Sequence, residues 1–277
     1  MNGIITLTTD FGEAGGYVAA MKGVILGIAP DAQLVDVSHR ISPQNVFEAA
    51  FLLSTVYRCF PRSAVHLVVV DPGVGTARKI VILKTPEGAF VAPDNGVLSY
   101  VLRDYVKENG EVVNGGLRKV ALIGDAKAVE VTNRRFFRQP VSDTFQGRDI
   151  MAPVAAMLSQ GFQMTAFGEA TDRLNMLDLP RPEKLRDGTL TGHALHFDTF
   201  GNIITDVRAA DLPSNGELRI EVGRHAVTGL KRTYAEGNGL MAIIGSSGYL
   251  EIALRGGSAA ALTELRVGDA IKIRAGA

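Results

Sequence analysis

Apolar runs rich in β-branched residues alternate with segments of helical periodicity over the first part of the chain. The strand-like runs are residues 4–8, 33–37, 65–70, 80–84, 89–92 and 120–123. The segments with helical spacing are residues 17–28, 45–59, 97–107 and 150–160, the last with Asp149 as its expected N-cap. Because parallel strands need helical crossovers between them, this order predicts an α/β domain with a largely parallel sheet over residues 1–170.

The pattern changes after residue 188, where short strand-like runs are separated by Gly, Asn, Asp and Ser. These runs are residues 194–197, 218–222, 240–244, 249–253 and 270–273. Short strands between turn-forming residues indicate a small antiparallel β domain, a barrel or a sandwich, over residues 189–277. The intervening stretch 171–188 holds Pro180 and Pro182 among several charges and is the expected linker.

Composition and charge exclude several classes of protein. The 277 residues are 46% hydrophobic and carry 29 basic and 29 acidic side chains, so the net charge is zero and no nucleic acid partner is indicated. The N-terminal segment lacks the basic region of a signal peptide, and no apolar run approaches the roughly 18 residues needed to span a bilayer. Cys59 is the only cysteine, which excludes an internal disulfide. We therefore expect a cytoplasmic protein without a membrane partner.

Three of the strand-like runs end in a turn that contains an aspartate. The turns are ThrThrAspPheGly at 8–12, AspProGlyValGly at 71–75 and AlaProAspAsnGly at 92–96. If the runs are parallel neighbours, their carboxyl ends meet at the edge of the sheet where α/β proteins bind ligands. Asp10, Asp71 and Asp94 or Asn95 would then line one cleft. Alternatively, each aspartate is an ordinary turn former or helix cap.

Arg78 follows Asp71 across a glycine-rich turn. The glycines would let the turn fold back, so that Asp71 and Arg78 meet in a buried, charge-assisted pair. The alternative is a surface arginine at the start of the next strand. Binding of NAD or ATP has little support, because the sequence lacks the dinucleotide fingerprint and the phosphate-binding loop. A serine hydrolase has little support because the nucleophile elbow is missing. None of the five histidines forms a two-histidine zinc helix, so no metal site is expected.

Six motifs, in order along nearly the whole chain, resemble those of the S-adenosylmethionine (SAM) hydroxide adenosyltransferases, which are related to the bacterial fluorinases and chlorinases. They are ThrThrAspPheGly at 8–12, AspProGlyValGlyThrAlaArg at 71–78, AlaProAspAsnGly at 92–96, PheGlnGlyArgAsp at 145–149, AspThrPheGlyAsnIleIleThr at 198–205 and GlySerSerGlyTyrLeuGluIleAla at 245–253. The resemblance implies an N-terminal α/β domain and a C-terminal β-barrel, assembled as a homotrimer with active sites between subunits. It also implies cleavage of SAM to adenosine and methionine by in-line attack of water or hydroxide on ribose C5′, without a metal or redox cofactor.

The resemblance implies a catalytic Asp–Arg–His set, and Asp71 and Arg78 match its first two members by position. The third member departs from the family pattern PheHisGlyArgAsp, because this chain has Gln146 where histidine is expected. Glutamine donates and accepts hydrogen bonds but takes no proton near neutral pH. Either the histidine of the family is mainly positional and Gln146 substitutes for it, or the chain is an impaired natural homologue or an engineered variant that binds SAM or adenosine.

The resemblance also implies contacts with the substrate. Asp10 resembles the carboxylate that takes both ribose hydroxyls, and Asn175 resembles an adenosine-binding asparagine. The resemblance implies further contacts with methionine and adenine from the barrel of a neighbouring subunit. The residues that would make them are Asp198, Phe200, Asn202 and Ser246. Tyr249, in the same barrel, is expected in the core instead.

A halide-using transferase is the third possibility. The halogenating relatives carry tyrosine at the position of Asp71 and serine at that of Gly147. Asp71 would repel an incoming anion in a low-dielectric pocket, and Gly147 offers no hydroxyl to hold one. Water is therefore the expected nucleophile.

Overall fold

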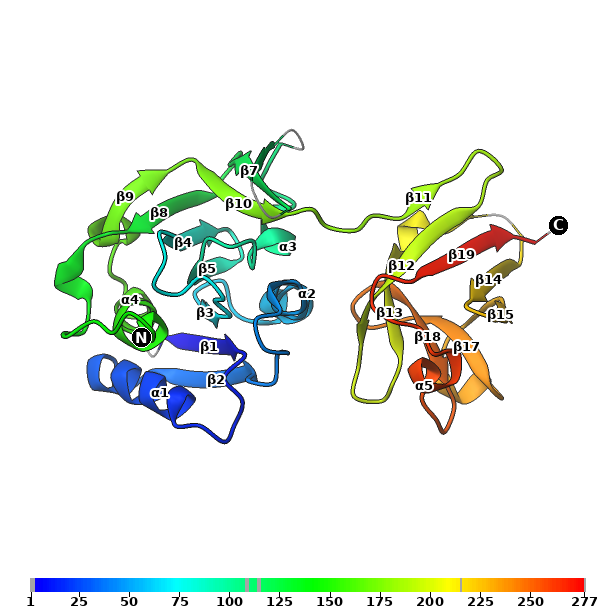
Figure 1. The fold of residues 1–277 in the computed structure, drawn as a ribbon, viewed down its shortest axis with the longest axis horizontal. Helices are drawn as coiled ribbons and strands as arrows, with labels where there is room; N and C mark the ends of the chain where they lie inside the picture. The colour runs from blue at the N-terminus through cyan, green and yellow to red at the C-terminus, as the bar shows by residue number, and fades with distance from the viewer. Residues whose placement is uncertain (1–2, 108–109, 114–115, 215, 277) are drawn as a thin grey trace. The chain divides into compact units, whose positions relative to one another are not determined.

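The computed structural model describes residues 3–107, 110–113, 116–214 and 216–276. They form two compact units, Met1–Leu179 and Pro180–Ala277 (Figure 1). The boundary falls inside the stretch 171–188 that was expected to be a linker. Part of that stretch is instead ordered as strand β10 (Arg173–Leu177), because Leu174 and Met176 are buried in the core of the first unit.

A seven-stranded mixed sheet forms the centre of the first unit. Its strands, in spatial order, are β2 (Gln33–Ser38), β1 (Ile4–Thr9), β3 (Val65–Val69), β5 (Gly88–Pro93), β4 (Ile80–Thr85), β8 (Lys127–Val131) and β9 (Gly168–Thr171). The first three pairings are parallel and the other three are antiparallel. The α/β class is confirmed, although the parallel part is confined to β2, β1, β3 and β5. The reason lies in the turn at residues 86–87, since two residues cannot make the crossover that parallel strands require.

Helices cover both faces of this sheet. They are α1 (Tyr17–Ile28), α2 (Val46–Val56), α3 (Ser99–Leu102) and α4 (Ala152–Ser159), with shorter turns η1 (Tyr57–Cys59), η2 (Arg134–Phe136) and η4 (Met164–Phe167). α1 and α4 pack together on one face, and α2 and α3 lie on the other (Figure 1). Strand β3 is buried along its whole length, as expected of a strand that is covered on both faces. Among the described residues, no helix is both long enough and apolar enough to cross a lipid bilayer.

Two predicted elements of the first unit differ from the structure. The helix expected at residues 97–107 is helical only in α3, because the chain then turns and the Tyr105 carbonyl accepts a hydrogen bond from Ile123 N at 2.8 Å. The strand expected at residues 120–123 is β7 (Leu117–Ala121). It pairs with β6 (Glu111–Val113) and β10 in a separate antiparallel sheet. Apolar spacing alone does not say which sheet a strand joins.

Asp149 is not the N-cap of the helix expected at residues 150–160. Helical backbone begins earlier, in the π-helical turn η3 (Gly147–Met151), which runs directly into α4. Asp149 lies inside this turn and is buried. A buried carboxylate needs polar partners, and Arg138 and Arg148 supply them.

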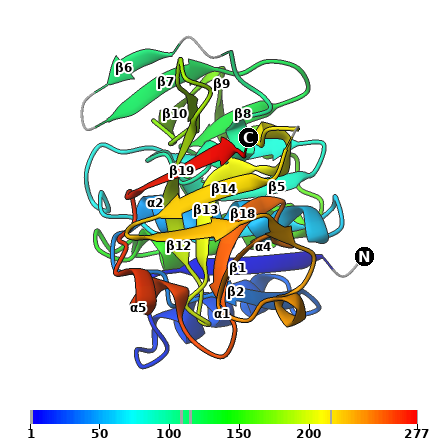
Figure 2. The ribbon, with the colours of Figure 1, turned by 90° about the vertical axis from the view of Figure 1, so that its right-hand side faces the viewer.

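The second unit is a curved sheet that nearly closes into a barrel (Figure 2). Its strands are β11 (Glu183–Lys184), β12 (Leu190–Phe197), β13 (Ile203–Arg208), β14 (Leu218–Val222), β15 (His225–Thr228), β16 (Leu230–Lys231), β17 (Leu240–Ile244), β18 (Tyr249–Leu254) and β19 (Ala270–Ala275), with η5 (Ala209–Asp211), η6 (Tyr234–Glu236) and helix α5 (Ala259–Thr263). The order is β15-β14-β19-β12-β13-β18-β17-β16, with β11 beside β12, and among these described pairs only β16–β17 is parallel. Strands β15 and β17 approach within 8 Å between Cα atoms, so the sheet curls round its core. The predicted antiparallel barrel is confirmed, and Tyr249 is buried in it as expected.

His66 of β3 is a buried histidine at the centre of the first unit. Its ring is 0% exposed and stacks on Phe90 with ring centroids 4.9 Å apart, and Nδ1 lies 2.9 Å from the Thr6 hydroxyl. Burial lowers the pKa of His66 from 6.5 to about 4. Because the folded-state pKa lies below the unfolded one, the unfolded chain binds a proton first. The protein therefore loses stability as the pH falls from 6.5 towards 4.

Replacing His66 with phenylalanine is expected to remove this pH dependence. Within that pH range, the free energy of unfolding of His66→Phe should fall less steeply with decreasing pH, by about 1.4 kcal/mol per pH unit. Urea unfolding at several pH values measures both slopes. Loss of the contact with Thr6 lowers the free energy of unfolding equally at every pH, so it does not itself contribute to the difference between the two slopes. Equal slopes for the two proteins would contradict the assignment.

Candidate active site

The carboxyl ends of β1, β3 and β5 lie side by side, because these strands are parallel neighbours. Thr9 of β1 pairs with Val69 of β3, so Asp10 and Asp71 begin the loops at adjacent strand ends. Asp94 directly follows β5, the next strand of the sheet. The prediction that the three aspartate turns meet at one sheet edge is confirmed.

Asp71 and Arg78 form a largely buried ion pair at this edge. Arg78 Nε lies 3.0 and 2.8 Å from the two carboxylate oxygens of Asp71, and Nη2 lies 2.5 Å from Oδ2. The side chains of Arg78 and Asp71 are only 11% and 5% exposed. Gly73 permits the turn to fold back, because a Cβ there would stand 3.1 Å from Arg78 Cγ. The predicted charge-assisted pair is confirmed, and the alternative of a surface arginine is wrong.

Gln146 forms a contiguous set with this ion pair. Arg78 Nη2 donates a hydrogen bond to Gln146 Oε1 at 2.6 Å. A guanidinium has only donors, so the amide turns its oxygen towards Arg78 and keeps its Nε2 donors for another acceptor. The guanidinium of Arg78 offers only donors, whereas the Asp71 carboxylate offers only acceptors, so the set presents both kinds of hydrogen-bonding group at one point.

Asp10 has one carboxylate oxygen held by the backbone. Oδ2 accepts a hydrogen bond from Gln44 N at 2.8 Å. Gln44 adopts a φ of +65°, a left-handed conformation that is uncommon for residues other than glycine. This contact fixes the carboxylate and leaves Oδ1 with its acceptor capacity. The contact of Asp10 with both ribose hydroxyls stays a prediction. In such a contact, Oδ2 of Asp10 would accept from a hydroxyl and from Gln44 N.

Asn95 and Asn175 reach the predicted edge but use their amides to hold strand ends together. Asn95 Nδ2 donates to the carbonyl of Val70, after β3, at 2.9 Å. Asn175 donates from its backbone N and its Nδ2 to the Asp94 carboxylate, at 2.7 and 3.0 Å. Burial raises the pKa of Asp94 despite the hydrogen bond from Asn175 N. The roles of both asparagines in substrate binding stay predictions.

The four predicted contacts of the barrel unit occupy two turns. Asp198, Phe200 and Asn202 lie between β12 and β13, where Asp198 Oδ1 accepts hydrogen bonds from the backbone N of the other two, at 2.9 and 2.8 Å. Phe200 is 78% exposed and contributes little to the core. Ser246 is exposed in the turn between β17 and β18. That these turns join the Asp71 edge in an assembled protein stays a prediction.

Glu251 and Tyr234 are polar residues of the barrel unit that sequence patterns did not single out. Tyr234 Oη donates to Glu251 Oε2 at 3.1 Å, and Glu251 is 7% exposed. Burial, together with the negative charge of Asp198, raises the pKa of Glu251. Burial and the Glu251 charge raise the pKa of Tyr234 to about 12. The available signal was a glutamate within the otherwise apolar run 249–253, since a carboxylate there needs a partner.

Family models for both domains of the SAM hydroxide adenosyltransferases match the chain. The N-terminal domain model matches residues 5–168, and the C-terminal domain model matches residues 192–272. The chain belongs to the SAM hydroxide adenosyltransferase family. The resemblance of the motifs is thereby confirmed, and Asp71, Arg78 and Gln146 all fall within the N-terminal match.

Relatives of the chain include hydrolases and, at lower identity, fluorinases. A protein of Salinispora tropica named (R)-S-adenosyl-L-methionine hydrolase is 37% identical in an alignment of 277 positions that covers 98% of each chain. A fluorinase of Nocardia brasiliensis is 26% identical over 99% of this chain and 97% of its own. A crystal structure of an uncharacterized conserved protein from Thermotoga maritima has a TM-score of 0.84 at 34% identity, over 97% of this chain and 99% of that one.

Gly147 has no room for the serine implied for the halogenating relatives. A Cβ at this position would stand 2.8 Å from Val69 Cγ1 and 3.6 Å from Met21 Sδ. The first distance is shorter than a carbon–carbon contact, so a side chain would displace Val69. Packed apolar groups therefore close the backbone of η3 on the side that faces the sheet.

The variant Gly147→Ser is expected to be less stable than the original chain by about 1–3 kcal/mol, because it overpacks this contact. Combining it with Val69→Ala makes room, so the double variant should be more stable than the two single changes predict by addition. Urea unfolding of the three variants measures this coupling. An undiminished stability of Gly147→Ser would contradict the closed packing.

Proposed function

We propose that this chain hydrolyses S-adenosyl-L-methionine to adenosine and L-methionine. The observation that carries the proposal is the contiguous set of Asp71, Arg78 and Gln146 at the sheet edge. Family relatives that are 32–37% identical and aligned over nearly their whole length are named SAM hydrolases, which supports it. The oxygen of water forms a bond to C5′ while the C5′–S bond breaks. The bonding electron pair goes to sulfur and neutralises the sulfonium, and the water gives up one proton.

Each member of the set has a separate role in this reaction. Arg78 orients the water and favours its hydroxide form through its positive charge. Asp71 accepts a hydrogen bond from the water and then its proton, which passes on to solvent. Gln146 accepts from Arg78 and so keeps the guanidinium in place. Positioning is the main demand, because the sulfonium leaves as a neutral thioether and needs little further activation.

We propose further that the substrate has the R configuration at the sulfonium. The hydrolases of Salinispora tropica and Thermus thermophilus are both named for the (R) form. The two epimers exchange the places of the substituents on sulfur, so a site that fixes the ribose and the amino acid cannot align both equally for attack. Initial rates with each purified epimer test this point. Equal rates would remove the stereochemical proposal and leave the hydrolysis standing.

We also propose a homotrimer in which the barrel unit of one subunit completes the Asp71 edge of the next. The exposed ring of Phe200 supports this assembly, because an uncovered aromatic face suits stacking on adenine. The reaction as proposed uses no metal or redox cofactor, no nucleic acid and no membrane partner, and its expected place is the cytoplasm. Light scattering measures the mass in solution. A fully active monomer would contradict the shared site.

Incubating the purified chain with SAM in oxygen-18 water tests the function. Chromatography and mass spectrometry are expected to show adenosine labelled at its 5′ oxygen and unlabelled methionine. Tight binding of SAM without product would support the second candidate, an impaired SAM-binding or adenosine-binding protein, which Gln146 in place of histidine favours. A 5′-halo-5′-deoxyadenosine product that needs added halide would support a transferase instead.

A further inference from the structure

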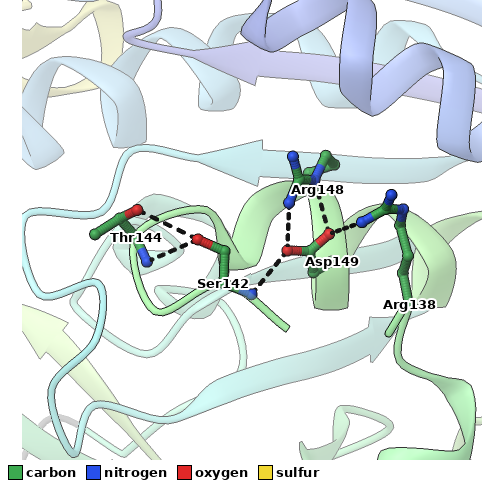
Figure 3. Close-up of polar contacts among 5 residues, drawn as sticks. All are labelled: Arg138, Ser142, Thr144, Arg148 and Asp149. Atoms are coloured by element: carbon green, nitrogen blue, oxygen red, sulfur yellow. Dashed lines mark hydrogen bonds and ion pairs between the residues drawn. The ribbon is translucent and has the colours of Figure 1, made fainter. Parts of the chain in front are cut away.

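A buried carboxylate anchors the loop of residues 138–149. Asp149 accepts hydrogen bonds from Arg148 Nε and Nη2, both at 2.7 Å, on its two oxygens. Arg138 Nη1 donates to Oδ1 at 3.1 Å, and the backbone N of Ser142 donates to Oδ2 at 2.9 Å. Figure 3 shows the two guanidinium groups and the Ser142 nitrogen converging on the carboxylate. Asp149 therefore ties together three other points of its own loop.

The surroundings of Asp149 keep its carboxylate charged. The side chain is 0% exposed, and burial alone would raise its pKa. Hydrogen bonds from Arg148, Ser142 and Arg138 outweigh burial and hold the pKa below its ordinary value. The side chains of Arg138 and Arg148 remain 45% and 27% exposed, so of the three only the carboxylate is removed fully from water. Leaving it unpaired would be costly, so the loop is held in the geometry that satisfies it.

The anchored loop also reaches the segment that follows Asp10. The Arg148 guanidinium lies over the ring of Phe145, 4.8 Å from its centroid. Phe145 packs edge-on against Phe11 and Tyr17, with centroid distances of 5.7 and 5.2 Å. The position of Arg148, which Asp149 fixes, thus bears on the packing of the loop after β1.

We propose that Asp149 is a positioning residue for hydrolysis that acts through Gln146. Gln146 lies between two anchored points, Ser142 and Asp149, and in this loop geometry its amide oxygen meets Arg78. Asp149 itself touches loop groups and not the reacting atoms. The inference rests on the proposed function, because the effect of Asp149 is read in the rate of SAM hydrolysis.

Amide hydrogen exchange measures how firmly Asp149 holds the 138–149 loop, and it needs no substrate. In Asp149→Asn, amides of the 138–149 loop are expected to exchange at least about tenfold faster than in the original chain. Arg138→Leu changes a half-exposed side chain and should give a smaller effect in the same direction, which keeps the test valid if Asp149→Asn does not fold. Asp143→Asn, at an exposed aspartate of the same loop, is the matched control and should change neither exchange nor rate.

A double-mutant cycle then separates positioning from general stability. With kcat normalised to the number of adenosine-binding sites, Asp149→Asn is expected to lower kcat at least about tenfold and to change KM less than about twofold. In a Gln146→Ala background the same substitution should change kcat less than about twofold, because the residue it positions is gone. Equal losses in both backgrounds, or unchanged loop exchange, would overturn the proposal. If the original chain forms no adenosine, the proposed function fails, and the exchange result still decides whether Asp149 anchors the loop.

Discussion

Alanine in place of Asp71 or Arg78 is expected to lower kcat for SAM hydrolysis by about 1,000-fold or more. Arg78 contacts both Asp71 and Gln146, so its loss removes the hydrogen bonds that hold the three residues together. Loss of Asp71 removes the acceptor that orients the water and takes its proton. Adenosine formation under saturating SAM measures the effect in both variants.

Breaking this buried pair also costs about 3–5 kcal/mol of stability, so rates must be compared between folded proteins. Adenosine binding and thermal unfolding establish the folded fraction. Arg58→Ala is the matched control, because it breaks an ion pair with Asp104 whose side chains are 57% and 53% exposed. It should cost less than about 1 kcal/mol and leave kcat unchanged. Turnover like that of the original chain in Asp71→Ala or Arg78→Ala would refute the assigned roles.

The variant Gln146→His is expected to gain a strong pH dependence that the original chain lacks. Neutral imidazole can accept from Arg78 as the amide oxygen does, but imidazolium has only donors and adds a second positive charge. The rate of Gln146→His should therefore fall about tenfold per pH unit below about pH 6.5, whereas that of the original chain stays nearly level down to pH 6. Profiles of kcat against pH for both proteins measure the difference.

The rates at pH 8 decide what Gln146 contributes. If its role is to accept from Arg78, Gln146→His should be no more than about tenfold faster there, because no general base is gained. Gln146→Leu, which cannot accept, should be at least about tenfold slower than the original chain, since it leaves an Arg78 donor unpaired. A gain of 100-fold or more in Gln146→His would mean that the original chain lacks a general base and is impaired.

The sequence predicted best those features that depend on residues close together in the chain. Asp71 and Arg78 flank a turn whose glycines allow it to fold back, and the turn follows an apolar strand, so their contact was predictable. The turns after β1 and β3 met as expected, because the helical connections α1 and α2 allow these strands to run parallel. β5 is parallel to β3 for another reason, since it follows the antiparallel strand β4 through a two-residue turn. The barrel strands were predictable from alternation and turn residues for the same local reason.

Long-range partners could not be read from local patterns. β4 runs antiparallel to β5 and β8, and an apolar run carries no direction. Asp149 has the sequence of a helix cap, but its partner Arg138 lies eleven residues away and the backbone turns helical before it. Glu251 is paired with Tyr234 only because the barrel brings β18 and η6 together.

A crystal structure of the chain with bound adenosine is the most direct test, because O5′ of this product is the former water oxygen. O5′ is expected within hydrogen-bonding distance, about 2.6–3.2 Å, of the Asp71 carboxylate and the Arg78 guanidinium. A nucleoside bound elsewhere, with that ion pair facing only solvent, would contradict the assignment of this sheet edge as the catalytic centre.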